Sequence, residues 1–268
     1  MKPAPFAYAP APSLAGALEL LDNEDAVALA GGQSLIPLLN FRLARPDVLV
    51  DLNPLSELDY LDVSGGGLRI GALSRQATLL HSATVAEGWP LLTEAVSHVG
   101  HAAIRSRGTV GGSVAHADPA AELPVALTAL DSRFHVRSRA GERTLSAPEL
   151  FRGPMTTALR TGELLVEIEV PAVAPGARMA FLEHARTHGD FALAGAAVVL
   201  VPGERAAIAL LGAASVPVRA DAAERALLDG ADAAEVAVLA AAGLGVGDDH
   251  RRALITALTR RALERVMA

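Results

Sequence analysis

Short apolar runs alternate with turn residues at the start of the chain, and this pattern predicts small elements. Leucines recur at helical spacing after Ser13, a residue type that favours helix N-caps. Residues 26–30 and 48–52 are largely apolar runs of strand length, and the first of them stops abruptly at Gly31-Gly32. Another apolar segment, 35–43, lies between them. We therefore expect a helix, a strand, a turn and a helix, followed by a second strand.

The middle of the chain mixes both periodicities without an internal repeat. Gly65-Gly66-Gly67 indicates a turn, and Gly88-Trp89-Pro90 interrupts a helical pattern. The predicted elements are a strand over 68–73, helical segments within 74–99, a helix over 121–130, and strands over 133–139 and 163–170.

A proline-rich stretch, 171–175, precedes the last third and is the best candidate for a domain boundary. The elements expected beyond it are strands over 179–186, 194–201 and 206–213, followed by helices. The last helix begins near Arg251 and has one apolar face, formed by Ile255, Leu258, Ala262 and Val266. Core packing is the favoured interpretation of that face, and a contact with another subunit is the alternative.

Composition excludes several classes of protein. With 51% hydrophobic and 20% charged residues among 268, the chain can form a sizeable core and is not expected to be disordered. A formal net charge of -7 argues against a nucleic-acid binder. No apolar run approaches the roughly 20 residues that span a bilayer, and the N-terminus lacks a signal-peptide core. We expect a cytoplasmic protein that is not transmembrane.

The sequence contains no cysteine. Disulfides, iron–sulfur clusters and thiolate metal sites are therefore excluded within this chain. Any redox group must be organic, or must be held by another subunit.

Two segments are rich in glycine: AGGQSLIP at 30–37 and GTVGGSVAHADP at 108–119. Because glycine has no Cβ, backbone N–H groups there could approach a pyrophosphate closely, and a Ser or Thr hydroxyl could add a donor. The alternative is two ordinary tight turns. Neither segment fits the G-x-G-x-x-G, P-loop or G-x-S-x-G pattern, so a Rossmann site, a P-loop and a serine hydrolase are not supported.

Several side chains outside the glycines are candidate ligands. Asp118 and Glu122 could accept hydrogen bonds from ribose or ribityl hydroxyls, although Asp118 could equally cap the next helix. The histidines form no convincing metal site, since H-E-x-x-H is absent. Of the two close pairs, His98/His101 and His184/His188, the second is expected on a strand and its loop rather than on one helix face. Phe191, in a short segment between two predicted strands, could pack on a flavin ring or serve as a core anchor.

The ordered set of motifs resembles one known family. AGGQSLIPLLNFRLARPDVLVDLN, AAIRSRGTVGGSVAHADPAAELP, TGELLVEIEVP and ARTHGDFALAG together resemble the FAD-binding medium subunit of the xanthine dehydrogenase and carbon monoxide dehydrogenase family, the molybdenum hydroxylases. The resemblance runs from Lys2 nearly to the C-terminus. The second motif is the most specific, because its Gly, His, Asp, Pro and acidic positions occur in register.

The resemblance implies an α+β fold with two parts. These are an FAD-binding domain of the vanillyl-alcohol-oxidase (PCMH) type over 1–173, with subdomains of about 1–55 and 56–173, and a C-terminal domain over 174–268 with a small antiparallel sheet and helices. It implies an oxidoreductase subunit that takes electrons from a small [2Fe–2S] subunit and passes them to an external acceptor. Substrate is hydroxylated on a large molybdopterin subunit, and the assembly is expected to be a dimer of heterotrimers.

The resemblance also implies which residues bind FAD. The pyrophosphate is expected between the two glycine segments, sugar-like hydroxyls at the acidic residues, adenine near 164–165, and the isoalloxazine near Ile104 and Phe191. Electron transfer requires no side-chain acid or base, so no catalytic or metal-ligating residue is expected. The expected cofactor-binding residues are Gly31, Gly32, Gln33, Ser34, Leu35, Ile104, Thr109, Val110, Gly111, Gly112, Ser113, Ala115, Asp118, Glu122, Leu164, Leu165, Asp190 and Phe191.

Two positions depart from the family pattern. Glu183 stands where many relatives carry a basic residue, and the segment 245–252 looks abbreviated. The organic substrate and the electron acceptor, whether NAD, quinone, oxygen or another carrier, are not readable from this chain. A free-standing flavoprotein without molybdenum partners is the alternative function, and a scaffold with an emptied cleft is a further one.

Overall fold

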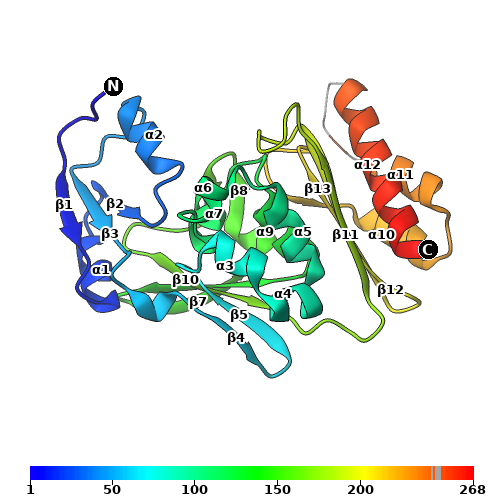
Figure 1. Cartoon of the computed structure of the whole chain (residues 1–268), viewed down its shortest axis with the longest axis horizontal. Helices are drawn as coiled ribbons and strands as arrows, with labels where there is room; N and C mark the ends of the chain where they lie inside the picture. Colours follow the sequence, from blue (N-terminus) through cyan, green and yellow to red (C-terminus); the bar gives the residue numbers. More distant parts are fainter. Residues whose placement is uncertain (243, 245–248) are drawn as a thin grey trace.

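The computed structural model describes residues 1–242, 244 and 249–268. Its N-terminal part is a parallel sheet in which β3 pairs with both neighbours, in the order β1-β3-β2 (Figure 1). Ser13 caps the first helix, since its hydroxyl accepts a hydrogen bond from the Gly16 N–H at 3.1 Å. The elements are β1 (Ala7–Pro10), α1 (Leu14–Leu20), β2 (Ala26–Leu29), α2 (Leu35–Asn40) and β3 (Val48–Asp51).

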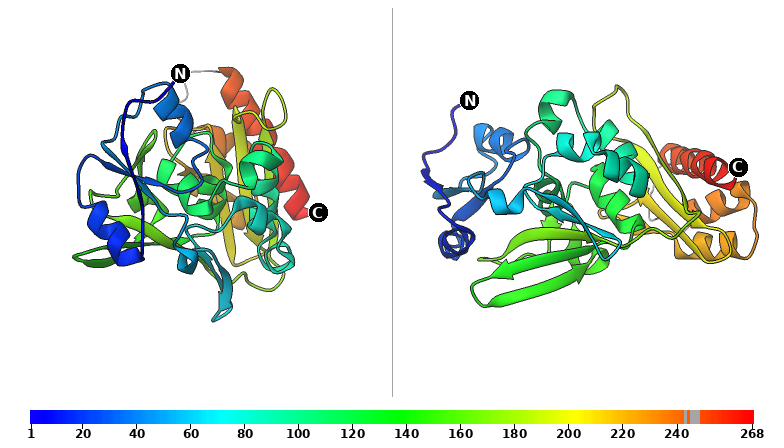
Figure 2. Two further views of the ribbon diagram at one scale, coloured as in Figure 1. Left: turned by 60° about the vertical axis from the view of Figure 1, so that its left-hand side comes forward. Right: turned by 60° about the horizontal axis from the view of Figure 1, so that its bottom comes forward.

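The central part is an antiparallel sheet in the order β4-β5-β10-β6-β7, with short helices gathered on one side of it (Figure 2). Its strands are β4 (Leu61–Ser64), β5 (Gly67–Gly71), β6 (Arg133–Ser138), β7 (Gly141–Ser146) and β10 (Leu164–Val170), with a separate hairpin of β8 (Phe151–Gly153) and β9 (Thr156–Thr157). Its helices are the 3-10 helix η1 (Ser56–Leu58) and α3 (Gln76–His81), α4 (Ala83–Gly88), α5 (Pro90–His98), α6 (Ala102–Arg105), α7 (Val110–His116), α8 (Glu122–Ala129) and α9 (Ala147–Leu150).

The C-terminal part is an antiparallel sheet covered on both faces. One face contacts α5 and α8, and the other contacts α10 and α12. Every residue of β12 is therefore buried, with Val199 on one side and Val198 on the other. The elements are β11 (Arg178–His184), β12 (Ala194–Val201), β13 (Arg205–Leu211), β14 (Val218–Arg219), α10 (Asp221–Leu228), α11 (Ala233–Ala242) and α12 (Asp249–Met267).

Most of the predicted elements are confirmed, including the mixed α and β class. The apolar face of α12 packs into the core around β12, as expected, and α5 begins at Pro90 where the helical pattern was interrupted. The sequence reading missed β1, β4 and β7, which are short and largely exposed. No helix within the described ranges has the length and apolar character needed to cross a membrane.

The second glycine segment differs from the alternative interpretation of an ordinary tight turn, because residues 110–116 form helix α7. Asp118 does not cap the following helix either: α8 starts at Glu122, and the Asp118 carboxylate instead accepts a hydrogen bond from the Ala120 N–H at 2.8 Å. Of the segment 245–252 that looked abbreviated, 245–248 lie outside the described residues, and 249–252 begin α12. The proposed division at 173 stays a prediction.

Candidate functional site

A cavity of about 850 Å³ lies between the N-terminal and central parts of the chain, within the usual range of cofactor sites. Its wall is formed by the end of β2, the start of α2, the helices α6 to α8, the start of β10 and the β11–β12 loop. Of the predicted site residues, it gathers Gly31, Gly32, Gln33, Ser34, Leu35, Ile104, Thr109, Gly111, Gly112, Ser113, Ala115, Asp118, Glu122, Leu164, Leu165, Asp190 and Phe191. Val110 is the exception, because its side chain is fully buried in the core.

The first glycine segment presents free backbone donors. Within the part of the chain that the structure describes, no N–H group from Gly31 to Leu35 donates to a protein acceptor. Gly32 has φ +74°, a left-handed conformation that turns the chain sharply after β2. Consecutive unpaired N–H groups around such a turn form an anion-binding concavity. This segment therefore fits the phosphate role that its sequence predicted.

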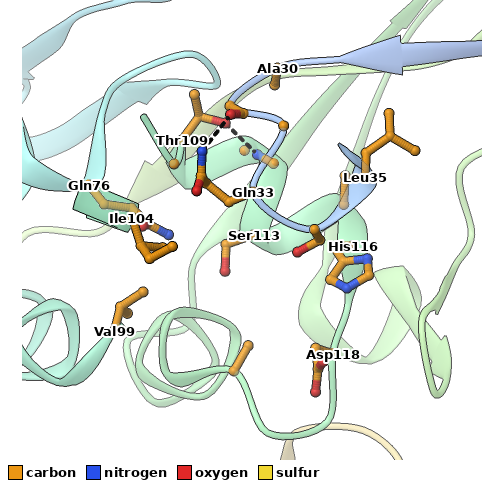
Figure 3. A pocket seen from close by; sticks show the side chains of 18 of the residues that line it. Ala30, Gln33, Leu35, Gln76, Val99, Ile104, Thr109, Ser113, His116 and Asp118 are labelled. Atoms are coloured by element: carbon orange, nitrogen blue, oxygen red, sulfur yellow. Dashed lines mark hydrogen bonds between the residues drawn. The ribbon is translucent and has the colours of Figure 1, made fainter. Parts of the chain in front are cut away.

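The second glycine segment cannot offer its amides in the same way. The N–H groups of Val110 and Gly111 donate to the Ser74 and Ala72 carbonyls at 2.9 Å each. The Gly112 N–H donates to the Thr109 hydroxyl oxygen at 3.0 Å. The Ser113 N–H donates to the Thr109 carbonyl at 3.1 Å, so the N–H groups of residues 110–113 are all paired within the protein. What α7 offers the cavity is the Ser113 hydroxyl, and Figure 3 shows Ser113 pointing into it.

The glycines have a packing reason that the sequence did not reveal. A Cβ on Gly31 would lie 2.4 Å from the Arg107 carbonyl oxygen, so the two glycine segments touch through backbone atoms. A Cβ on Gly111 would lie 2.5 Å from the Ala72 Cβ. Gly111 therefore allows α7 to pack closely on the chain after β5.

A polar network, which no local sequence pattern indicates, ties the two glycine segments together. The Asn53 side-chain amide donates to the Ala30 carbonyl at 2.9 Å, next to the first glycine segment. The Arg75 guanidinium donates to the Asn53 side-chain oxygen at 2.7 Å and to the Arg107 carbonyl at 2.6 Å. These hydrogen bonds fix the spacing between the two glycine segments.

One wall of the cavity carries a buried carboxyl group. Glu122 is only 7% exposed, and burial raises the pKa of its carboxyl to about 8, with the charge of Glu183 adding to the effect. Glu183 is buried behind it, and its Oε1 lies 3.4 Å from the His98 Nδ1. The hydrogen bond to Glu183 raises the pKa of His98. Glu183, which stands where many relatives carry a basic residue, thus places a carboxylate and its partner His98 beside Glu122.

The opposite wall is apolar and partly open. Val99 and Ile104 point toward the cavity from α5 and α6 (Figure 3). Phe191 is 74% exposed in the β11–β12 loop, so the interpretation as a core anchor is wrong. Gly189 lets this loop approach α6, since a Cβ there would lie 2.6 Å from the His101 ring. An aromatic ring is therefore held at the mouth of an apolar slot.

The far end of the cavity is lined by Leu164 and Leu165 at the start of β10, both nearly fully buried. Sequence reasoning missed several other lining residues; among these are Gly108 and His116 within the second glycine segment, and Gln76, Leu159, Glu163 and Arg186 elsewhere in the chain.

The described residues contain no cluster of three or more His, Cys, Asp or Glu side chains that could hold a metal ion. His98 instead contacts Glu183, and His101 packs on Gly189. The cavity combines an anion-binding turn, hydroxyl groups and apolar slots. This arrangement suits binding a large cofactor that carries phosphate.

Comparison with known proteins agrees with the geometry. Residues 4–173 match the family model described as the FAD binding domain in molybdopterin dehydrogenase. The chain is 45% identical to the 6-hydroxypseudooxynicotine dehydrogenase complex subunit alpha of Paenarthrobacter nicotinovorans, over 85% of this chain and 80% of that protein. It is 38% identical to the caffeine dehydrogenase subunit beta of Pseudomonas sp. (strain CBB1), over 99% and 96%.

The same similarity holds in three dimensions. Carbon monoxide dehydrogenase from Hydrogenophaga pseudoflava, solved in a form that lacks the Mo-pyranopterin moiety of the molybdenum cofactor, contains a chain that superposes with a TM-score of 0.94. The two are 35% identical, and the match covers 100% of this chain and 99% of that one.

Proposed function

The chain belongs to the family of FAD-binding domains of molybdopterin dehydrogenases, and we propose that it binds FAD in the cavity and transfers electrons within a larger enzyme. The resemblance to the medium subunits of the xanthine dehydrogenase and carbon monoxide dehydrogenase family is confirmed, and with it the class of oxidoreductase subunit. The finer fold proposal is a PCMH-type FAD domain over 1–173 and a C-terminal domain over 174–268.

The observation that carries the proposal is the row of unpaired N–H groups from Gly31 to Leu35, in a segment that lines the cavity together with Thr109 and Ser113. These groups would hold the FAD pyrophosphate. Ile104 and Phe191 would border the isoalloxazine, and exclude water from it. Asp118 and Glu122 would bind ribose or ribityl hydroxyls of FAD, and Leu164 and Leu165 would contact its adenine.

Bound FAD supplies the redox chemistry, and the chain supplies its placement and electrostatic surroundings. In this proposal, electrons arrive from a [2Fe–2S] subunit and leave to an external acceptor. Cluster ligands must come from another chain, since this sequence has no cysteine. The matched proteins are named as subunits of dehydrogenases, which supports partners that include a large molybdopterin subunit.

Purified chain should show the flavin absorption bands, at about 370 and 450 nm, and keep them through desalting. If it is purified colourless, added FAD should bind and restore the bands, because the phosphate-binding turn is formed by the chain itself. A folded chain that stays colourless after FAD is added would contradict the assignment and support a scaffold with an emptied cleft.

A tagged chain expressed in its own cells should co-purify with a chain that carries [2Fe–2S] clusters and one that carries molybdopterin. The metals in the purified complex, iron and molybdenum, can be measured against flavin content. Flavin-loaded chain that purifies alone, without either metal, would instead support the free-standing flavoprotein.

A further inference from the structure

One buried polar side chain on the cavity wall has no partner. Gln76, the first residue of α3, is only 4% exposed. Its backbone N–H donates to the Gly108 carbonyl at 2.9 Å, which fixes the residue against the second glycine segment. Its side-chain oxygen is buried and makes no hydrogen bond with any described residue. A buried amide oxygen without a partner costs free energy that an apolar side chain would avoid.

The neighbouring glycine leaves the space that this side chain occupies. A Cβ on Gly108 would lie 2.5 Å from the Gln76 Oε1 and 3.0 Å from the Ile104 carbonyl oxygen. Any other residue at 108 would therefore push the carboxamide aside. Because Gly108 has no side chain, it leaves room for the Gln76 carboxamide, and both residues line the cavity.

The position of Gln76 in the cavity indicates which part of FAD could bind its carboxamide. Figure 3 shows its carboxamide beside Ile104, on the side of the cavity that also holds Gln33 and Thr109. It thus lies between the glycine segments and the apolar slot. In the proposed arrangement, the part of FAD that joins the pyrophosphate to the isoalloxazine is the ribityl chain. Its hydroxyl groups both donate and accept, so they match a carboxamide in either orientation.

We propose that the Gln76 carboxamide binds a ribityl hydroxyl of FAD. This inference rests on the proposed function, since it requires FAD in the cavity. Gln76 is then a cofactor-binding residue that the sequence did not reveal, and Gly108 is a positioning residue that keeps its side chain in place.

The test uses Gln76→Met, which keeps the length of the side chain and removes its hydrogen bonds. Binding of FAD, riboflavin and lumiflavin to the FAD-free chain is followed by quenching of flavin fluorescence. Lumiflavin has the ring without the ribityl chain. We expect the variant to bind FAD and riboflavin about tenfold more weakly, as for one lost hydrogen bond, and to bind lumiflavin unchanged. The melting temperature of the FAD-free variant should rise, because the unpartnered group is gone.

Thr93→Val is the matched control. The Thr93 hydroxyl is also buried without a partner among the described residues, but Thr93 does not line the cavity. This variant should gain stability and keep its affinity for FAD. A Gln76→Met chain that binds FAD like the parent would overturn the inference and leave the FAD assignment intact. Equal weakening of lumiflavin binding would overturn the ribityl assignment, and a parent chain that binds no FAD would remove both.

Discussion

Replacing Gly31 with valine is expected to weaken FAD binding at least about 100-fold, or roughly 2.7 kcal/mol. A Cβ at this position would lie 2.4 Å from the Arg107 carbonyl oxygen and 2.8 Å from the Gly108 Cα. Backbone atoms cannot swing aside as a flexible side chain can, so the first glycine segment must move away from residues 107–108. The row of N–H groups from Gly31 to Leu35 then shifts relative to the rest of the cavity wall.

The experiment measures FAD affinity by titration of the FAD-free chain, with circular dichroism to verify folding. Gly31→Ala is the milder companion, because it carries the same clash with a smaller side chain. Gly88→Ala is the control, since a Cβ there meets nothing within 4 Å and its φ is not in the left-handed region. Gly31→Ala with the affinity of the parent would show that the contact between the two segments does not govern binding.

Glu122 should make the FAD-free chain less stable as pH rises from about 4.5 to 8, and Glu122→Gln should remove that contribution. The folded-state pKa of Glu122 is raised from its ordinary 4.5 to about 8 by burial. Between those values the folded chain holds a proton that the unfolded chain has released, so the free energy of unfolding falls with pH. Below about pH 4.5 both states are protonated and no penalty exists. At about 1.4 kcal/mol per pKa unit, the loss above pH 8 is on the order of a few kcal/mol.

Urea unfolding at a series of pH values measures this directly. The groups that face Glu122 are Glu183 and Asp118, whose charges raise its pKa, and His98, whose charge lowers it. The difference in stability between Glu122→Gln and the parent should therefore grow between pH 5 and 8 and then level off. Glu87→Gln, at an exposed position, is the control and should show no such trend. Parallel pH profiles for the parent and Glu122→Gln would contradict the assigned burial penalty.

Much of the fold could be predicted because its core strands are continuous apolar runs. Residues 194–201 are all buried between two layers, and such a run is visible without knowledge of the neighbours. By contrast, β7 (Gly141–Ser146) is mostly polar, since much of it is exposed to solvent. Its place in the sheet depends on pairing with β6, which local sequence does not show.

The site was predictable as a set of segments, but not in its physical details. Adjacent glycines disfavour a helix, yet residues 110–116 form one because Thr109 caps it and Gly111 packs on Ala72. Gln76 was missed because its role depends on Gly108, which is distant in sequence. The same holds for Arg75, whose partners come from separate elements. A local sequence pattern does not show contacts between residues that are distant in the sequence.

The first of the touching glycine segments follows β2 in the N-terminal part, and the second contains α7 in the central part, so a cofactor lying across them would join these two parts of the chain. A ligand that binds only the folded chain raises its stability in proportion to the logarithm of its concentration. Cells short of riboflavin would then hold a larger fraction of this chain partly opened along that contact. Proteases act on such opened forms. The vitamin supply would in this way influence how much of the protein survives, as well as how much of it is active.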